Sequence, residues 1–245
     1  MALKVFVLGR PGSGKSTATR RILKLVQRKG LSAIRVNDYE ILQSWFKQEK
    51  FQPCNDHKQF RCTAYNGFDV TDFSVLNTAL EELEKRVWKY IYSAKNEFIL
   101  IEFARDDYGK ALSFFSKNFL QNAYFLFLDA DIDTCIQRVH ERTVHPTTLD
   151  DHFVSDDIIR LYYNKDNKPC TISDLKIDYD IDDKRLEIID NTSSLQSFAE
   201  KINTFVEGIF EREATSLQRL PVLQEISSSR KTGPLNVPSA CVLVR

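Results

Sequence analysis

The sequence lacks the features that mark several broad classes of protein. Its five cysteines are odd in number and form no C-x-x-C pair, which argues against a disulfide framework or a zinc site and favours reduced thiols. No apolar run approaches the length needed to span a membrane. The first expected strand begins at residue 3, which predicts no signal peptide. Together these absences favour a cytoplasmic protein.

Neither sign of charge predominates, since the chain carries 34 basic and 34 acidic residues. Proteins that coat nucleic acids are usually basic, so nucleic acid is not an expected partner. The chain also lacks the N-K-x-D motif that reads guanine, which argues against a regulatory GTPase. Locally, residues 1–35 hold nine Lys or Arg and no Asp or Glu. This suits a phosphate-binding region as well as an ordinary solvated surface.

One motif near the N-terminus is complete: residues 9–16 match G-x-x-x-x-G-K-[ST]. An apolar strand over residues 3–8 precedes it, and an amphipathic helix over residues 17–29 follows. In this arrangement backbone N–H groups and a helix N-terminus converge on a phosphate. We expect Lys15 to bind the donor phosphates and Ser16 to bind Mg²⁺. The expected nucleotide-binding residues here are Gly9, Arg10, Pro11, Gly12, Ser13, Gly14, Lys15, Ser16 and Thr17.

Apolar strands and amphipathic helices alternate along the rest of the chain. Strands are expected over residues 31–36, 98–101, 123–128 and 186–189. Helices are expected over residues 39–50, 71–94, 108–117, 132–142, 156–163 and 195–211, while residues 51–70 look irregular. The alternation predicts a three-layer α/β/α fold with a five-stranded parallel sheet.

The same pattern suggests how the chain is divided. Residues 1–213 would form the folded domain, with a polar lid insert over about 143–183. Residues 214–245 are rich in proline and serine, which is typical of a flexible tail. The short apolar stretch Cys241–Val244 could still dock as an edge strand.

Polar residues follow several of the predicted strands, at the edge where parallel sheets bind ligands. Asp38 could orient and deprotonate the hydroxyl of a phosphoryl acceptor; the alternative is that Asn37 or Asp38 simply caps the next helix. Glu102 could hold Mg²⁺ or the acceptor. Arg105 could clamp an anionic acceptor, or pair with Glu102. Asn191 ends the last strand at the same edge.

Two arginines lie one helical turn apart beside the lid insert. Arg138 and Arg142 could neutralise charge on a transferred phosphoryl group while a closing lid excludes water. The alternative is a solvated helix face, on which paired arginines are common. We expect a catalytic role for at least one of them.

Three of these segments carry a family resemblance. Val36-Asn37-Asp38-Tyr39 resembles the acceptor-base segment of P-loop polynucleotide kinases and related small nucleotide-kinase-like enzymes. Arg138-x-x-x-Arg142 resembles their lid arginines, and Asp190-Asn191-Thr192-Ser193 resembles their adenine-contacting loop. The resemblance covers about residues 3–211. It implies a sheet with the P-loop strand at its centre, ATP as donor, Mg²⁺, and adenine contacts from Asn191 and Thr192.

The sequence therefore favours a P-loop kinase, an ATP-dependent phosphotransferase. Its catalytic residues would be Lys15, Asp38, Arg138 and Arg142, with acceptor contacts from Asp38, Glu102 and Arg105, and Mg²⁺ ligands from Ser16 and Glu102. The acceptor would be a small hydroxyl compound or a nucleotide, bound under residues 39–70. The alternative is an ATP-binding regulatory module that hydrolyses ATP slowly and signals to a partner. An ATPase motor subunit ranks last, because Ile101-Glu102 offers only one carboxylate where such a motor expects two.

Overall fold

The computed structural model describes residues 2–50, 58–93, 95, 97–146, 148–164, 176–179 and 181–228. The chain divides into two compact units, Met1–Val206 and Glu207–Arg245. The first unit contains all of the elements discussed below except the C-terminal part of the last helix. Among the described residues, no helix is both long enough and apolar enough to cross a membrane.

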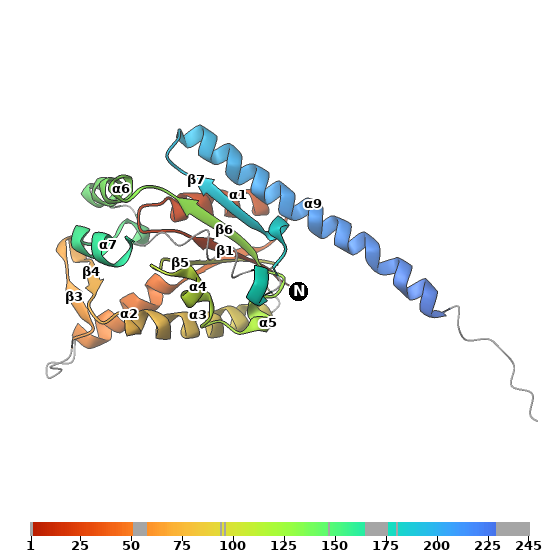
Figure 1. Cartoon of the computed structure of the whole chain (residues 1–245), viewed down its shortest axis with the longest axis horizontal. Helices are drawn as coiled ribbons and strands as arrows, with labels where there is room; N and C mark the ends of the chain where they lie inside the picture. The colour runs from red at the N-terminus through yellow and green to blue at the C-terminus, as the bar shows by residue number, and fades with distance from the viewer. Residues whose placement is uncertain are drawn as a thin grey trace, which may run out of the picture. The chain divides into compact units, whose positions relative to one another are not determined.

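Five parallel strands form the central sheet of the first unit (Figure 1). Across the sheet their order is β2-β5-β1-β6-β7. The central strand is therefore β1, which precedes the glycine loop of residues 9–16. The three middle strands are nearly continuous apolar runs, as expected where helices cover both faces of a parallel sheet. The predicted fold class is confirmed. The strand bounds are β1 (Leu3–Leu8), β2 (Ala33–Asn37), β5 (Phe98–Phe103), β6 (Tyr124–Asp129) and β7 (Leu186–Asp190).

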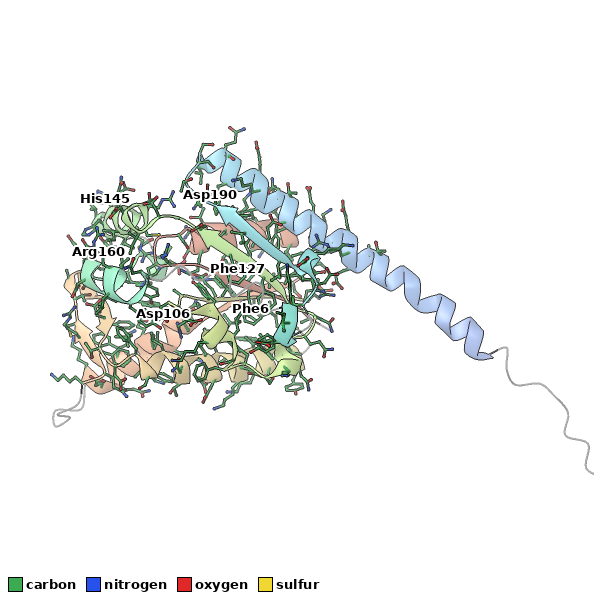
Figure 2. All side chains as sticks on the ribbon, viewed as in Figure 1. Phe6, Asp106, Phe127, His145, Arg160 and Asp190 are labelled. Atoms are coloured by element: carbon green, nitrogen blue, oxygen red, sulfur yellow. The ribbon has the colours of Figure 1, made fainter. Side chains whose placement is uncertain are left out.

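The core of this unit is rich in phenylalanine. Phe6 of β1 stacks on Phe125 of β6 with the ring centroids 4.9 Å apart. Figure 2 shows Phe6 and Phe127 among the strands, where both side chains are almost fully buried. Close packing of these rings fixes the strands against one another, and with them the polar residues at the strand ends.

Helices cover both faces of the sheet (Figure 1). On one face lie α2 (Asp38–Lys50), α3 (Ser74–Tyr92), α4 (Tyr108–Leu112) and α5 (Lys117–Leu120), and α1 (Lys15–Arg28) lies on the other. The first turns of α9 (Leu195–Ser228) are joined to α1, because Arg21 Nε donates to Ala199 O at 3.1 Å and to Asn203 Oδ1 at 2.8 Å.

The lid insert packs beside α6 (Ile132–Val144). Its described part contains a short 3₁₀ turn, η2 (Leu149–Asp151), the helix α7 (Asp156–Tyr162) and a second turn, η3 (Asp183–Arg185). Arg160 of α7, labelled in Figure 2, donates to Asp133 of α6 at 2.7 Å. Residues 147, 165–175 and 180 of the insert lie outside the described residues.

Three expectations about local structure were wrong. A small antiparallel hairpin, β3 (Phe60–Cys62) and β4 (Phe68–Val70), joined through the 3₁₀ turn η1 (Ala64–Asn66), occupies a segment expected to be irregular. The helix expected over 108–117 is two short helices, because the chain turns before Ser116 and begins α5 there. The last helix does not end near Glu211 but continues to Ser228. The remainder of the expected tail, with the Cys241–Val244 stretch, lies outside the described residues.

Candidate active site

A cavity of about 510 Å³ lies at the carboxyl ends of β2 and β5. Residues of the glycine loop and the start of α1 line it, as do Asp38 and Glu102. Arg138 and Arg142 of α6, with residues of the lid, complete it. The tertiary structure thus brings residues of the 9–16 loop, the expected acceptor base and the expected lid arginines into the lining of one cavity.

Two glycines of the loop are required by its geometry. Gly12 and Gly14 have φ angles of 83° and 102°, in the left-handed region that glycine adopts without strain. A Cβ atom on Gly12 would lie 2.2 Å from the carbonyl oxygen of Cys135, and one on Gly14 would lie 2.4 Å from Asn191 Nδ2. Side chains here would push the loop away from α6 and from the end of β7.

Lys15 is the first residue of α1, and its ammonium group bonds to the loop that precedes it. Nζ donates to Gly9 O at 2.8 Å and to Arg10 O at 2.9 Å. Burial lowers the pKa of Lys15 from 10.5 to about 8, against the opposing charge of Glu102. A bound phosphate would favour the protonated form of Lys15 and would give its ammonium group further hydrogen-bond acceptors.

Ser16 and Glu102 both line the cavity, and their oxygen atoms suit Mg²⁺. Glu102 Oε2 accepts from Arg35 Nε at 2.8 Å and from Thr19 Oγ1 at 3.2 Å, which fixes the carboxylate at the end of β5. The described residues contain no group of three His, Cys, Asp or Glu that could hold a metal by themselves. An ion bound by Ser16 and Glu102 would need further ligands, which the phosphates of a bound nucleotide could supply.

Asp38 is joined to Arg105, and this pair corrects one reading of the sequence. Arg105 Nη1 donates to Asp38 Oδ2 at 2.5 Å, and Nη2 donates to Leu76 O at 2.6 Å. Burial is the largest influence on the pKa of Arg105 and lowers it, but the charge of Asp38, the nearby Tyr163 and Tyr162 and the hydrogen bond to Asp38 together outweigh burial, so the pKa is raised. The considered Glu102–Arg105 ion pair is absent from the described contacts, since Glu102 pairs with Arg35 instead.

The two lid arginines line the cavity, and each has one buried polar atom that the described residues leave without a hydrogen-bond partner. Arg138 Nη2 donates to Asn191 O at 2.8 Å, and Arg142 Nη2 donates to His152 O at 2.9 Å. Arg138 Nη1 and Arg142 Nε are buried and unpaired. Buried donors of this kind are costly to leave unpaired, and their burial argues against a fully solvated helix face. Burial also lowers the pKa of Arg142, with the charges of Asp151 and Asp150 opposing it.

Several predicted nucleotide-binding residues support the loop from outside the cavity wall. Arg10 Nε donates to Tyr163 O at 2.7 Å, and Arg10 Nη1 donates to Ala130 O at 3.1 Å. Asn191 Nδ2 donates to Ser13 O at 2.9 Å. These bonds tie the loop to the lid and to the last strand, and the proposed adenine contacts of Asn191 and Thr192 stay predictions. Among described residues, the predicted ones absent from the wall are Gly9, Arg10, Ser13, Asn191 and Thr192.

Sequence reasoning missed an ion pair that joins the sheet to the lid. Arg35 of β2 lies beside Glu102 and also bonds both oxygens of Asp150, with Nη1 to Oδ2 at 2.9 Å and Nη2 to Oδ1 at 2.7 Å. Burial opposes the charged form of Arg35, but Glu102 and Asp150 outweigh it and raise its pKa. The only sequence signal was an arginine inside an otherwise apolar strand.

A second missed residue is Asp69 of the hairpin, whose side chain is fully buried. It accepts from Arg61 at 2.7 Å, and from Ser155 Oγ and N at 2.5 and 3.1 Å. Because Ser155 immediately precedes α7, this carboxylate fastens the lid to the hairpin. A strand too short to show a periodicity gave no signal for it.

Comparison with known proteins finds structural likeness only. No protein-family model and no curated protein matches the sequence. A gluconokinase from Sinorhizobium meliloti 1021 is similar in structure, with 15% identity, a TM-score of 0.49, and coverage of 87% of this chain and 97% of that one. At such identity the function has to be inferred from the side chains of the site.

Two further solved structures are similar at the same level. Shikimate kinase from Acinetobacter baumannii, in complex with shikimate, shows 11% identity and a TM-score of 0.43, covering 86% of this chain and 95% of that one. The tunicamycin resistance protein of Deinococcus radiodurans shows 12% identity and a TM-score of 0.45, covering 84% and 96%.

Proposed function

We propose that this protein is an ATP- and Mg²⁺-dependent kinase that transfers the γ-phosphate to a hydroxyl group of a small molecule. The observation that carries the proposal is the placement of Asp38. Its carboxylate lines the same cavity as Lys15 of the P-loop and the two lid arginines. A protein that only sensed ATP would have no use for a carboxylate base facing the phosphate site.

The contacts of Asp38 suit a general base. Oδ2 is held by Arg105, while Oδ1 makes no hydrogen bond to the described part of the chain. An acceptor hydroxyl could therefore donate to Oδ1 and be held in line with the γ-phosphorus. As the acceptor oxygen forms its bond to phosphorus, the bond to the β-phosphate bridging oxygen breaks, ADP leaves, and the hydroxyl proton passes to Asp38.

The charged residues around the phosphates would stabilise this transfer. Lys15 would balance charge on the donor phosphates, and the guanidinium groups of Arg138 and Arg142, which line the cavity, would neutralise charge on the transferred group. Bound Mg²⁺, held by Ser16 with help from Glu102, would supply further charge neutralisation. The lid, fastened by Arg35–Asp150 and Asp69–Ser155, would keep water from competing with the acceptor.

A transfer screen tests the proposal. The protein is incubated with γ-labelled ATP, Mg²⁺ and panels of nucleosides, nucleotides, sugars and 5′-hydroxyl oligonucleotides, and labelled products are separated from ATP and inorganic phosphate. We expect transfer to at least one hydroxyl compound, and loss of that transfer in Asp38→Asn with ATP binding retained. Tight ATP binding with release of inorganic phosphate only, unaffected by every acceptor and by Asp38→Asn, would favour the regulatory module instead.

A further inference from the structure

A chain of polar contacts runs from the sheet through the lid to one of the lid arginines. It begins at Glu102, near the end of β5, which accepts from Arg35 Nε at 2.8 Å. Arg35 also bonds both carboxylate oxygens of Asp150 in η2, at 2.9 and 2.7 Å. Two residues after Asp150, His152 O accepts from Arg142 Nη2 at 2.9 Å. All five residues line the cavity of the candidate site.

The link between Arg35 and Asp150 fixes an orientation as well as a distance. A guanidinium that meets both oxygens of a carboxylate allows the two groups much less freedom than a single bond does. Both side chains are largely buried, with 20% and 17% of their surfaces exposed, so salt and water weaken this pair less than they would at the surface. The strand β2 therefore holds the η2 turn in one place.

The turn and His152 should move as one piece. Thr148 and Asp151 close η2 with a reciprocal capping box, in which Thr148 N donates to Asp151 Oδ2 at 2.9 Å. The His152 ring, directly after the turn, stacks on Tyr39 with the centroids 3.7 Å apart. A shift of η2 would therefore carry the His152 carbonyl with it.

The lid has anchors on both sides of His152. Asp69 of the hairpin holds Ser155, three residues after it, and Arg35 holds Asp150, two residues before it. Because Asp150 lies between α6 and His152, its release frees the connection that leads out of α6 even while Ser155 stays fixed. The negative charge of η2 also depends on this placement: Asp151 and Asp150 oppose the effect of burial on the pKa of Arg142.

We propose that Arg35 is a positioning residue, which holds the Arg142 guanidinium in the cavity through the η2 turn of the lid. The inference rests on the proposed kinase function and adds a residue of β2 to it. Arg35 acts through Arg142 and not on the transferred group, so its loss should matter only while Arg142 is present. A merely structural arginine, or one that acts on Mg²⁺ through Glu102, would behave differently.

A double-variant cycle tests this. Single-turnover transfer from γ-labelled ATP, to whichever acceptor the transfer screen identifies, is measured in Arg35→Met, Arg142→Ala and the double variant. We expect Arg35→Met to lower the rate by about 10- to 100-fold, as a displacement of about 1 Å does, and Arg142→Ala to lower it on the order of 10³-fold. The double variant should stay within about threefold of Arg142→Ala, whereas independent losses would multiply to about 10⁴–10⁵-fold.

The same cycle is measured without an acceptor. The full-length protein is titrated by calorimetry with ADP and Mg²⁺, with and without aluminium fluoride, which mimics the transferred phosphoryl group. We expect Arg35→Met and Arg142→Ala each to weaken binding of the fluoride complex by about tenfold or more, with much smaller changes for ADP and Mg²⁺ alone. The double variant should bind the fluoride complex no more weakly than Arg142→Ala does.

Asp150→Asn separates the lid from the metal site. It replaces one of the two oxygens that Arg35 meets and leaves the Arg35–Glu102 pair intact, so it is also the milder change for the fold. It should reproduce the losses of Arg35→Met with the Mg²⁺ dependence of the parent. A loss that Arg35→Met shows alone, together with a changed Mg²⁺ requirement, would place the effect at Glu102 and overturn the inference.

Two further variants control for stability. Arg35→Lys keeps the charge but lacks the planar fork, so it should recover the melting temperature more than the rate. Arg160→Met is the matched control, because it breaks another arginine–aspartate pair of the lid at the same 2.7 Å, exposed between α7 and α6. It should change neither the rate nor the affinity for the fluoride complex.

The outcomes separate this inference from the function on which it rests. Non-additive losses in the fluoride complex, without transfer to any acceptor, support the positioning role and overturn the kinase function. Transfer whose losses multiply in the double variant overturns the inference and leaves the kinase function standing. The inference is also wrong if Arg35→Met lowers only the melting temperature, or if Arg142→Ala leaves both the rate and the fluoride complex unchanged.

Discussion

Arg105 and Asp38 form a buried ion pair at the centre of the site, with Nη1 and Oδ2 2.5 Å apart. Arg105 also donates to two main-chain carbonyls, of Leu76 and Ala104, so its guanidinium is anchored on α3 and on the end of β5. It presents the Asp38 carboxylate in one orientation. The same pair therefore contributes both to stability and to the proposed chemistry, and variants can separate the two.

We expect Asp38→Asn and Arg105→Met each to lower the free energy of unfolding by about 3–5 kcal/mol, because each leaves one buried charge without its partner. The double variant should be closer to the parent in stability. Phosphoryl transfer should fall about 10²–10⁴-fold in Asp38→Asn and should not recover in the double variant. Denaturant titrations and initial rates check both parts; equal recovery of stability and transfer would show that Asp38 is only structural.

The lid arginines should act on the transition state rather than on ATP binding. Arg142→Ala and Arg138→Ala should each lower the single-turnover rate on the order of 10³-fold, with much smaller changes in ATP affinity. Lysine should rescue poorly, since an ammonium lacks the planar fork of the guanidinium. Arg160→Ala, on the exposed face of α7, is the control. Parallel losses of rate and affinity would remove both arginines from catalysis.

ATP binding should depend on pH through Lys15. Burial lowers its pKa from 10.5 to about 8, so the free protein loses this charge as the pH rises through 8. ATP affinity should then fall by at most about tenfold per pH unit above 8, and binding near pH 8 should take up a proton. Calorimetry in buffers of different ionisation enthalpy measures the uptake. In Lys15→Ala the affinity should be low and the proton uptake gone, whereas Lys24→Ala on the same helix should behave as the parent.

Asp69 should hold the lid to the hairpin. Asp69→Ala removes one charge-assisted bond to Arg61 and two bonds to Ser155. We expect a loss of at least about 1.5–3 kcal/mol in the free energy of unfolding. Hydrogen exchange should also quicken in α7 before it changes in the sheet. Asp157→Ala, which loses only an exposed contact to Arg61, is the comparison; equal effects of the two variants would contradict the role of Asp69.

Local structure near the site could be predicted well where the sequence carries a long periodic signal. The spacing of the glycine loop is typical of a strand before it and a helix after it, and the flanking residues show both periodicities. Because the strands are parallel, Asp38 and Glu102, which lie at strand ends, are expected at the same edge of the sheet. The hairpin Phe60–Val70 could not be predicted, because strands of three residues are too short to show an alternation. The length of α9 was also missed, since the proline and serine content from about Thr215 onward favoured a tail over a helix.

The sequence by itself determined the strand, glycine loop and helix at residues 3–28, the parallel sheet and the identity of the polar residues at the strand ends, because each depends on neighbours a few positions apart. Only the tertiary structure decided which charges meet. Arg105 and Asp38 are 67 positions apart, and Arg35 and Asp150 are 115 apart. These pairings follow from the placement of β5 beside β2 and from the fold of the lid over the strand ends, which no local pattern encodes.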